Sequence, residues 1–203
     1  FKLNRLFIPS QTIFPSSLGN YILAKIDDCE QRMAGYVKPK FAIVHSEYLY
    51  NSQTGEFCVV ESALRGGGVY ISSHLVPLYS GIDINETLLD CICGMTIDMD
   101  DVMSKRNDKA AAYVCFYLPE GIITNVNGME AAANMPFVKM MCVDDVKVGN
   151  IAPPLTHKGK RLGPIIVIGD NRLDINKNIT QLQNTIKVTI EDKKGYKHGI
   201  NWE

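Results

Sequence analysis

Two short runs of this sequence hold the side chains that could do chemistry. Glu47 and Glu61 supply carboxylates, Arg65 supplies a guanidinium, and Gly66-Gly67-Gly68 supplies backbone free of side chains. Carboxylate oxygens are the ligands that Mg²⁺ prefers, usually shared with the phosphates of a nucleotide. A guanidinium binds a phosphate or carboxylate through two parallel hydrogen bonds, and a glycine run lets backbone N–H groups approach an anion. The spacing therefore indicates a site for Mg²⁺ and a phosphate-bearing ligand.

A β-hairpin is the element that must position the two acids. The β-rich runs 41–50 and 56–62 flank a polar loop that ends in Gly55, a pattern typical of a hairpin. Side chains alternate along a strand, so a register that pairs residue 47 or 45 with residue 61 places both glutamates on one face. Their Cβ atoms would then lie roughly 5–8 Å apart.

The same alternation places the apolar residues Ile43, Phe57 and Val59 on the face of the two acids. We therefore expect this face to be at least partly covered rather than fully exposed to solvent. Two neighbouring carboxylates buried without a partner would cost several kcal/mol, so we expect a cation between them. His45 also shares this face and could contact substrate or orient Glu47. The alternative is an edge hairpin with solvated acids and a flexible glycine turn, which explains each feature singly but not their combination.

The elements around the hairpin are expected to be mainly helical. Apolar residues spaced by three or four positions predict a helix over 16–36, with a serine of Pro15-Ser16-Ser17 as its cap. The glycine run should break regular structure before the β-prone segment 69–73. Asp83 has the spacing of a capping residue for a short helix that Gly94 ends. Residues 95–108 are acidic and then mixed, which indicates a helix tail and a linker.

The second half of the chain is expected to be rich in strands. The boundary near residue 105 divides the chain into domains 1–105 and 106–203. A helix is expected over 172–184, and residues 125–130 and 161–163 are interpreted as turns. The predicted strands are 110–118, 121–126, 137–143, 164–168 and 185–190.

Composition narrows the class of protein. The 203 residues are 46% hydrophobic and carry a net charge of −1, so a basic face for nucleic acid or an anionic membrane is not expected. No apolar run approaches the roughly 18 residues of a membrane span. The six cysteines form no CxxC pair or zinc spacing and stand mostly in apolar runs. We therefore expect a cytoplasmic protein with free thiols. The exposed face of the second domain could pair with another subunit, so a homo-oligomer stays open. His74 is expected to be packed, and His157 and His198 to lie on the surface.

The stretch from His45 to Ile84 resembles the C-terminal part of an ATP-grasp domain. His45-Ser46-Glu47, Glu61, Arg65, Gly67-Gly68 and the later Gly81-Ile82-Asp83 match the motifs of that family in order and spacing. The resemblance implies that Glu47 and Glu61 bind the Mg²⁺ or Mn²⁺ ions that bridge ATP phosphates, with Gly67 and Gly68 contacting the nucleotide. It implies that Arg65 is catalytic and steadies the transferring phosphoryl group or an acyl phosphate. Ala63 stands where the family often has Asn, so the resemblance does not supply a complete two-metal site.

The resemblance continues over residues 111–132, 146–154 and 160–170, which are similar to the C-terminal domain of ATP-grasp L-amino-acid ligases. The predicted fold class is α+β: the C-terminal portion of an ATP-grasp fold, an antiparallel sheet with helices, followed by a small β-rich α+β domain.

The implied activity is ATP-dependent joining of a small carboxylate to an amine through an acyl phosphate. A carbamoyl-phosphate-synthase-like or biotin-carboxylase-like enzyme acting on bicarbonate, or a non-catalytic binding module, stays open. The chain begins with Phe, and the family's adenine pocket and phosphate-binding lysines lie largely upstream of the acids. We therefore expect a truncated, inactive portion or one chain of a split enzyme.

Overall fold

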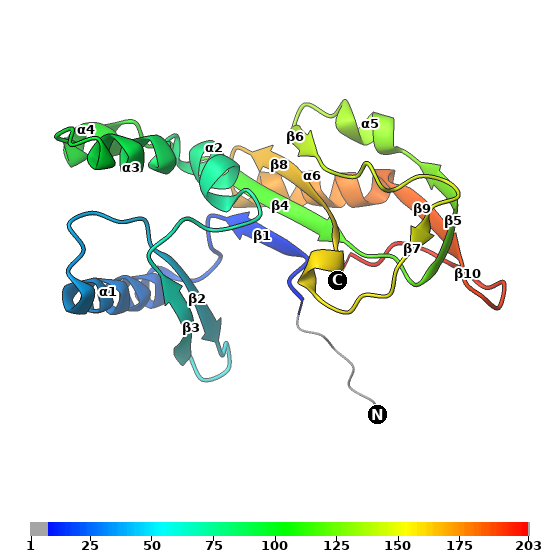
Figure 1. Ribbon diagram of the computed structural model, residues 1–203, viewed down its shortest axis with the longest axis horizontal. Helices are drawn as coiled ribbons and strands as arrows, with labels where there is room; N and C mark the ends of the chain where they lie inside the picture. The colour runs from blue at the N-terminus through cyan, green and yellow to red at the C-terminus, as the bar shows by residue number, and fades with distance from the viewer. Residues whose placement is uncertain (1–7, 203) are drawn as a thin grey trace. The chain divides into compact units, whose positions relative to one another are not determined.

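A computed structural model describes residues 8–202, which form two compact units (Figure 1). One unit comprises Ser16–Asn107, and the other joins the chain from Asp108 onward to the segment before Ser16. This division lies two residues from the boundary proposed from sequence. It differs for the N-terminal segment, because strand β1 (Gln11–Phe14) pairs antiparallel with β4 (Ala110–Phe116).

The unit Ser16–Asn107 consists of a hairpin, a π-helical turn and helices. Its elements are α1 (Asn20–Val37), β2 (His45–Tyr50), β3 (Phe57–Ala63), a π-helical turn η1 (Ile71–Leu75), α2 (Val76–Ser80), α3 (Ile84–Ile92) and α4 (Met99–Ser104). The hairpin prediction is confirmed, although β2 starts at His45. Residues 41–44, which were predicted to belong to the first strand, have no strand partner in the hairpin, because β3 ends at Ala63, opposite His45.

Helix α1 follows its predicted apolar stripe but not its predicted cap. Ile22, on the stripe, is the buried residue of the helix. The helix begins at Asn20 after Gly19, and no side chain caps it. Ser16 Oγ instead accepts a hydrogen bond from the backbone N–H of Leu18, at 3.1 Å, one turn too early to serve the helix. The serine-cap prediction is therefore wrong.

The segment after the glycine run is helical, so the prediction of a β-prone stretch over 69–73 is wrong. Tyr70 lies in the left-handed region, and the chain then forms η1, which runs directly into α2. Leu75 in η1 is completely buried. Burial of this face outweighs the modest strand propensity of Ile and Val.

Helices α3 and α4 have carboxylate caps. Asp83 accepts hydrogen bonds from the backbone N–H groups of Asn85 and Glu86, both at 3.0 Å, which confirms the predicted helix start. Gly94 follows the helix with φ +81°, as expected for a residue that ends a helix. The predicted linker contains a further helix, α4, whose cap Asp98 accepts from Asp100 N–H at 2.9 Å.

In its described residues, the other unit consists of two antiparallel sheets and two helices longer than a single turn. One sheet has the strand order β1-β4-β8-β6 and the other the order β10-β9-β5-β7. The remaining elements are β5 (Gly121–Asn127), α5 (Met129–Ala133), β6 (Val138–Met141), β7 (Ile151–Ala152), the 3₁₀ turn η2 (Lys158–Lys160), β8 (Leu162–Gly169), α6 (Arg172–Thr185), β9 (Lys187–Glu191) and β10 (Lys197–His198). The mixed helices and antiparallel sheets confirm the predicted α+β class.

The hydrophobic core of this unit lies between its sheets and α6. Every residue of β4 is buried, as its continuous apolar run predicts for a strand covered on both faces. Ile175, Ile179 and Leu182 recur at helical spacing on α6 and join the same core. Burial raises the pKa of the Cys115 thiol in β4, so this cysteine is an inert core residue. All six cysteines are free, as expected.

Two segments interpreted as turns are regular structure. Asn125 lies in β5 and Glu130 in α5, with only the left-handed Gly128 (φ +80°) turning the chain between them. Leu162 and Gly163 begin β8, where they extend the sheet rather than reverse it. The turn interpretation is therefore wrong for most of these residues.

Candidate functional site

The two candidate acids lie directly opposite each other in the hairpin. Glu47 pairs with Glu61, which is one of the two registers predicted from sequence. A β-bulge follows, because Tyr48 pairs with Val59 and leaves Val60 without a partner of its own. A bulge interrupts the alternation of side chains along its strand. Phe57 and Val59 therefore belong to the face of Tyr48, and the expectation that they share the acids' face is wrong.

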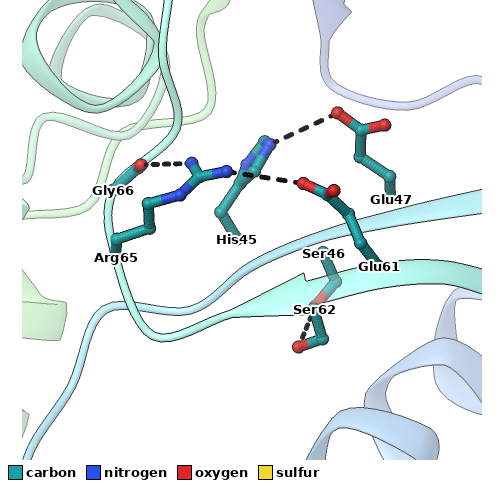
Figure 2. Close-up of polar contacts among 7 residues, drawn as sticks. All are labelled: His45, Ser46, Glu47, Glu61, Ser62, Arg65 and Gly66. Atoms are coloured by element: carbon teal, nitrogen blue, oxygen red, sulfur yellow. Dashed lines mark hydrogen bonds and ion pairs between the residues drawn. The ribbon is translucent and has the colours of Figure 1, made fainter.

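The face opposite the acids is the one that packs on α1. The Tyr48 hydroxyl donates to Glu30 Oε1 on that helix at 2.6 Å, and the Tyr48 ring contacts Phe57 edge-on at 5.7 Å. Burial, reinforced by the hydrogen bond to Glu30, raises the pKa of Tyr48 above its usual range. Ser46 Oγ donates to Ser62 Oγ at 2.8 Å on this side, so Ser62 points away from the acids as predicted (Figure 2).

On the acid face, each glutamate has a basic neighbour. His45 Nε2 lies 3.8 Å from Glu47 Oε1, and an Arg65 guanidinium nitrogen lies 3.4 Å from Glu61 Oε1. Arg65 also donates to the carbonyl of Gly66 at 3.0 Å. Figure 2 shows these side chains on one side of the hairpin, with Ser46 and Ser62 on the other. The sequence-predicted acids and arginine are thus brought together, and His45 joins them.

The two acids are exposed to solvent, so the expected burial penalty is absent. The side chains of Glu47 and Glu61 are 54% and 52% exposed, so solvent screens their repulsion and no burial penalty demands a cation between them. Both contacts to basic neighbours are longer than the 2.7–2.9 Å of a strong charge-assisted hydrogen bond. The carboxylates therefore keep oxygen atoms available for a ligand.

The glycine run is closely packed rather than flexible. A Cβ atom on Gly66 would lie 2.6 Å from Ser72 Oγ, and one on Gly67 would lie 2.9 Å from Ile71 Cβ and 3.0 Å from His45 Nδ1. A Cβ on Gly68 would meet nothing within 4 Å. Gly66 and Gly67 thus allow η1 to approach the hairpin, and Gly68 leaves its backbone open.

Two strained residues follow the glycine run. Val69 and Tyr70 have φ angles of +51° and +61°, a region that costs a non-glycine residue about 1–3 kcal/mol. No sequence signal points to them, because a β-branched residue is the least expected in this conformation. Such strain clusters at ligand-binding segments, and here it stands next to the exposed backbone of Gly68.

The acid pair fits a divalent cation only in combination with a ligand that brings its own oxygens. Among residues 8–202, no group of three or more His, Cys, Asp or Glu is arranged to hold a metal ion. Mg²⁺ keeps several waters and is commonly bound by one or two carboxylates together with substrate phosphates. Two half-exposed carboxylates on one face satisfy that requirement. Ala63 pairs with His45 in the hairpin and adds no oxygen to the set.

The remaining histidines lie elsewhere. His74 accepts or donates in a 2.9 Å hydrogen bond with Ser73 and packs edge-on against Tyr70, as expected for a packed histidine. His157 is more than a surface residue, because its side chain caps η2 by accepting from Gly159 N–H at 3.1 Å. His198 forms a 3.0 Å ion pair with Asp192 and lies partly exposed.

The fold of the chain is shared with known protein structures. The chain has the fold of the C-terminal portion of an ATP-grasp ligase, which confirms the resemblance of the sequence. Within it, residues 114–191 match the family model of L-amino acid ligase C-terminal domain 2.

Several solved structures have a similar fold. The L-amino acid ligase from Bacillus licheniformis has a TM-score of 0.76 at 16% identity, over 92% of this chain and 45% of that one. Phosphoribosylglycinamide synthetase from Anaerococcus prevotii has a TM-score of 0.72 at 13% sequence identity, over 90% of this chain and 46% of that one. N5-carboxyaminoimidazole ribonucleotide synthetase from Thermotoga maritima has a TM-score of 0.59 at 14% sequence identity, over 88% of this chain and 45% of that one.

The chain thus spans just under half the length of these three proteins, and identities this low describe the fold alone. Among curated proteins none matches the sequence. No helix in the described part of the chain has the length and apolar composition required to cross a membrane.

Proposed function

We propose that this chain supplies the residues that bind the divalent cation and the ATP phosphates in an ATP-dependent carboxylate–amine ligase. The observation that carries the proposal is the direct pairing of Glu47 with Glu61, with Arg65 3.4 Å from Glu61 on the same face. The fold of the chain and the match of residues 114–191 to the L-amino acid ligase domain support this choice over other metal-dependent activities.

In this proposal, Glu47 and Glu61 hold Mg²⁺ or Mn²⁺ that arrives with ATP. The bound cation would neutralise phosphate charge and orient the terminal phosphate. Arg65 then supplies a fixed positive charge for the phosphoryl group that passes to the substrate carboxylate. Its guanidinium makes a 3.4 Å contact to Glu61 and a 3.0 Å hydrogen bond to the carbonyl of Gly66, which leaves further N–H groups that could donate to a phosphate.

The other residues of the acid face position these groups. His45 lies 3.8 Å from Glu47 and close to Gly67, so its ring could orient the Glu47 carboxylate. Gly68 is exposed, and its backbone N–H could donate to an anion. Transfer of the terminal phosphoryl group of ATP to the substrate carboxylate would give an acyl phosphate and ADP. An amine that attacks its acyl carbon would form the amide bond, with cleavage of the acyl C–O bond and release of inorganic phosphate and a proton. The small carboxylate and the amine are the substrates of the proposed reaction.

Paramagnetic broadening of backbone amide signals by Mn²⁺ tests the proposal. We expect Mn²⁺ with ATP to broaden the signals of residues 45–48 and 60–68 selectively, and Glu61→Gln to abolish the effect. Glu56→Gln is the matched control, because Glu56 is an exposed acid of the same hairpin whose carboxylate bonds Thr54 at the loop. Equal broadening in wild type and Glu61→Gln would refute the metal site.

One observation favours a second candidate, a non-catalytic binding module with the same fold. Ala63 stands on the acid face opposite His45 and contributes no metal ligand. If Mn²⁺ with ATP leaves the hairpin signals of the wild type unchanged, the module is the better description.

A further inference from the structure

The carbonyl groups of the glycine run each accept a hydrogen bond. Their donors are Arg65 to Gly66 at 3.0 Å (Figure 2), the Ser72 hydroxyl to Gly67 at 3.1 Å, and the Ile71 backbone N–H to Gly68 at 3.1 Å. Because a carbonyl carries no proton, the Ser72 hydroxyl uses its single proton in this contact. The peptide groups of the glycine run therefore have fixed orientations.

The N–H groups on the other side of two of these peptide groups are unoccupied. The peptide bonds here are trans, so the N–H and C=O of each point in opposite directions. The donors Ser72 and Ile71 both belong to η1, and the N–H groups of Gly68 and Val69 consequently point away from those donors. Both residues are exposed, and within residues 8–202 neither N–H has an acceptor. Unoccupied backbone N–H groups of fixed direction are suited to an anion.

Ser72 is itself held in place from two sides. Leu75, in the same π-helical turn, is completely buried and anchors η1. On the other side, Gly66 leaves the space that the serine occupies, since a Cβ atom on Gly66 would lie 2.6 Å from Ser72 Oγ. The hydroxyl therefore reaches the carbonyl of Gly67 from an element that does not need to move when a ligand binds.

We propose that Ser72 is a positioning residue that directs the Gly68 N–H toward a phosphate of ATP bound at the acid face. The inference rests on the proposed function, because that function supplies the anion. Ser72 acts through the Gly67–Gly68 peptide group and does not touch the nucleotide. Without its hydroxyl this peptide group is freer to rotate, so binding of the anion must order it at the expense of affinity.

The carbonyl ¹³C chemical shift of Gly67 tests the hydrogen bond in the free protein. In Ser72→Ala this carbonyl loses its donor, and its signal should move upfield. Ser73→Ala is the matched control, because the Ser73 hydroxyl is exposed and bonds His74 at 2.9 Å instead. The Gly67 signal should stay in place in this control. An unmoved Gly67 signal in Ser72→Ala overturns the proposal.

Titration with Mg²⁺ and ATP tests the consequence for binding. In wild type the amide proton signal of Gly68 should move downfield and saturate. Ser72→Ala should weaken the affinity about fivefold, the net effect of one hydrogen bond. Ser72→Cys should weaken it similarly, because a thiol fills the space but donates weakly. Wild-type affinity in Ser72→Cys would assign the effect to packing and overturn the proposal, as would equal losses in Ser72→Ala and Ser73→Ala.

This proposal and the proposed function fail in different ways. Broadening of residues 45–48 by Mn²⁺ with ATP, without a response of Gly68 to Mg²⁺ with ATP, leaves the acid site intact and overturns the role of Ser72 alone. Absence of any response of the hairpin to either mixture overturns both. Unchanged amide signals of β2 in the free variants show that each variant keeps its hairpin.

Discussion

The close packing of the glycine run predicts that two neighbouring glycines respond oppositely to the same substitution. A Cβ atom in Gly67→Ala would lie 2.9 Å from both Cβ and Cγ2 of Ile71 and 3.0 Å from His45 Nδ1. These distances are well inside van der Waals contact, so η1 or the His45 ring must shift. In Gly68→Ala the added methyl group meets nothing within 4 Å, and the backbone there has no left-handed φ.

The magnitudes follow from this difference. Overpacking a close contact typically costs about 1–3 kcal/mol. Replacing a glycine by alanine where the conformation allows it stabilises a protein by about 0.4–1 kcal/mol, because the unfolded chain loses freedom. We therefore expect Gly67→Ala to lower the free energy of unfolding of the hairpin unit and Gly68→Ala to leave it unchanged or raise it slightly.

The single tryptophan provides an internal control for the measurement. Trp202 packs on Phe116 in the other unit at 4.9 Å between ring centroids, so its fluorescence reports that unit alone. In urea titrations, Gly67→Ala should shift the far-UV circular dichroism transition to lower denaturant and leave the fluorescence transition in place. Equal circular dichroism transitions for the two variants would refute the packing argument, as would a shift confined to fluorescence.

Two further predictions concern protonation. The pKa of Tyr48 is raised, so its contribution to stability is complete below the unfolded-state pKa of about 10 and is lost as pH rises through the folded-state value. In Tyr48→Phe, the melting temperature measured by circular dichroism should therefore fall less steeply as pH rises above about 10. An unchanged slope counts against the contact between Tyr48 and Glu30. The hydrogen bond from His198 holds the pKa of Asp192 below its usual range, so its contribution is present above about pH 3.9 and is lost as pH falls through the folded-state value. The protection factors of the amides in β9 and β10, which correct for the intrinsic exchange rate at each pH, should fall on acidification in wild type, and a similar pH dependence in Asp192→Asn would contradict this assignment.

The parts of the fold that the sequence predicted are those set by local chemistry. The Asp83 cap, the Gly94 helix end and the hairpin around Asn51–Gly55 follow from side-chain hydrogen bonds and from the conformational freedom of glycine. The buried strand β4 follows from its unbroken apolar run. These signals act over a few residues, so they can be detected without knowledge of the tertiary contacts.

The errors arose where distant contacts outweigh local preference. The segment after Gly68 has strand propensity but is helical, because Leu75 is buried. Strand β1 has no clear signal of its own and is defined by its pairing with β4, about a hundred positions later in the sequence.

For the acid face, the sequence by itself determined the residue types and the hairpin, and it left two registers open, with Glu61 opposite either Glu47 or His45; the structure shows the pairing with Glu47. Only the tertiary structure decided which side of that hairpin the acids occupy. The bulge at Val60 moves Phe57 and Val59 to the face of Tyr48, and the contact of Tyr48 with Glu30 turns that face toward α1. The acids are therefore left half-exposed because an irregular strand pairing, which no local pattern encodes, reverses the alternation on which the sequence argument rests.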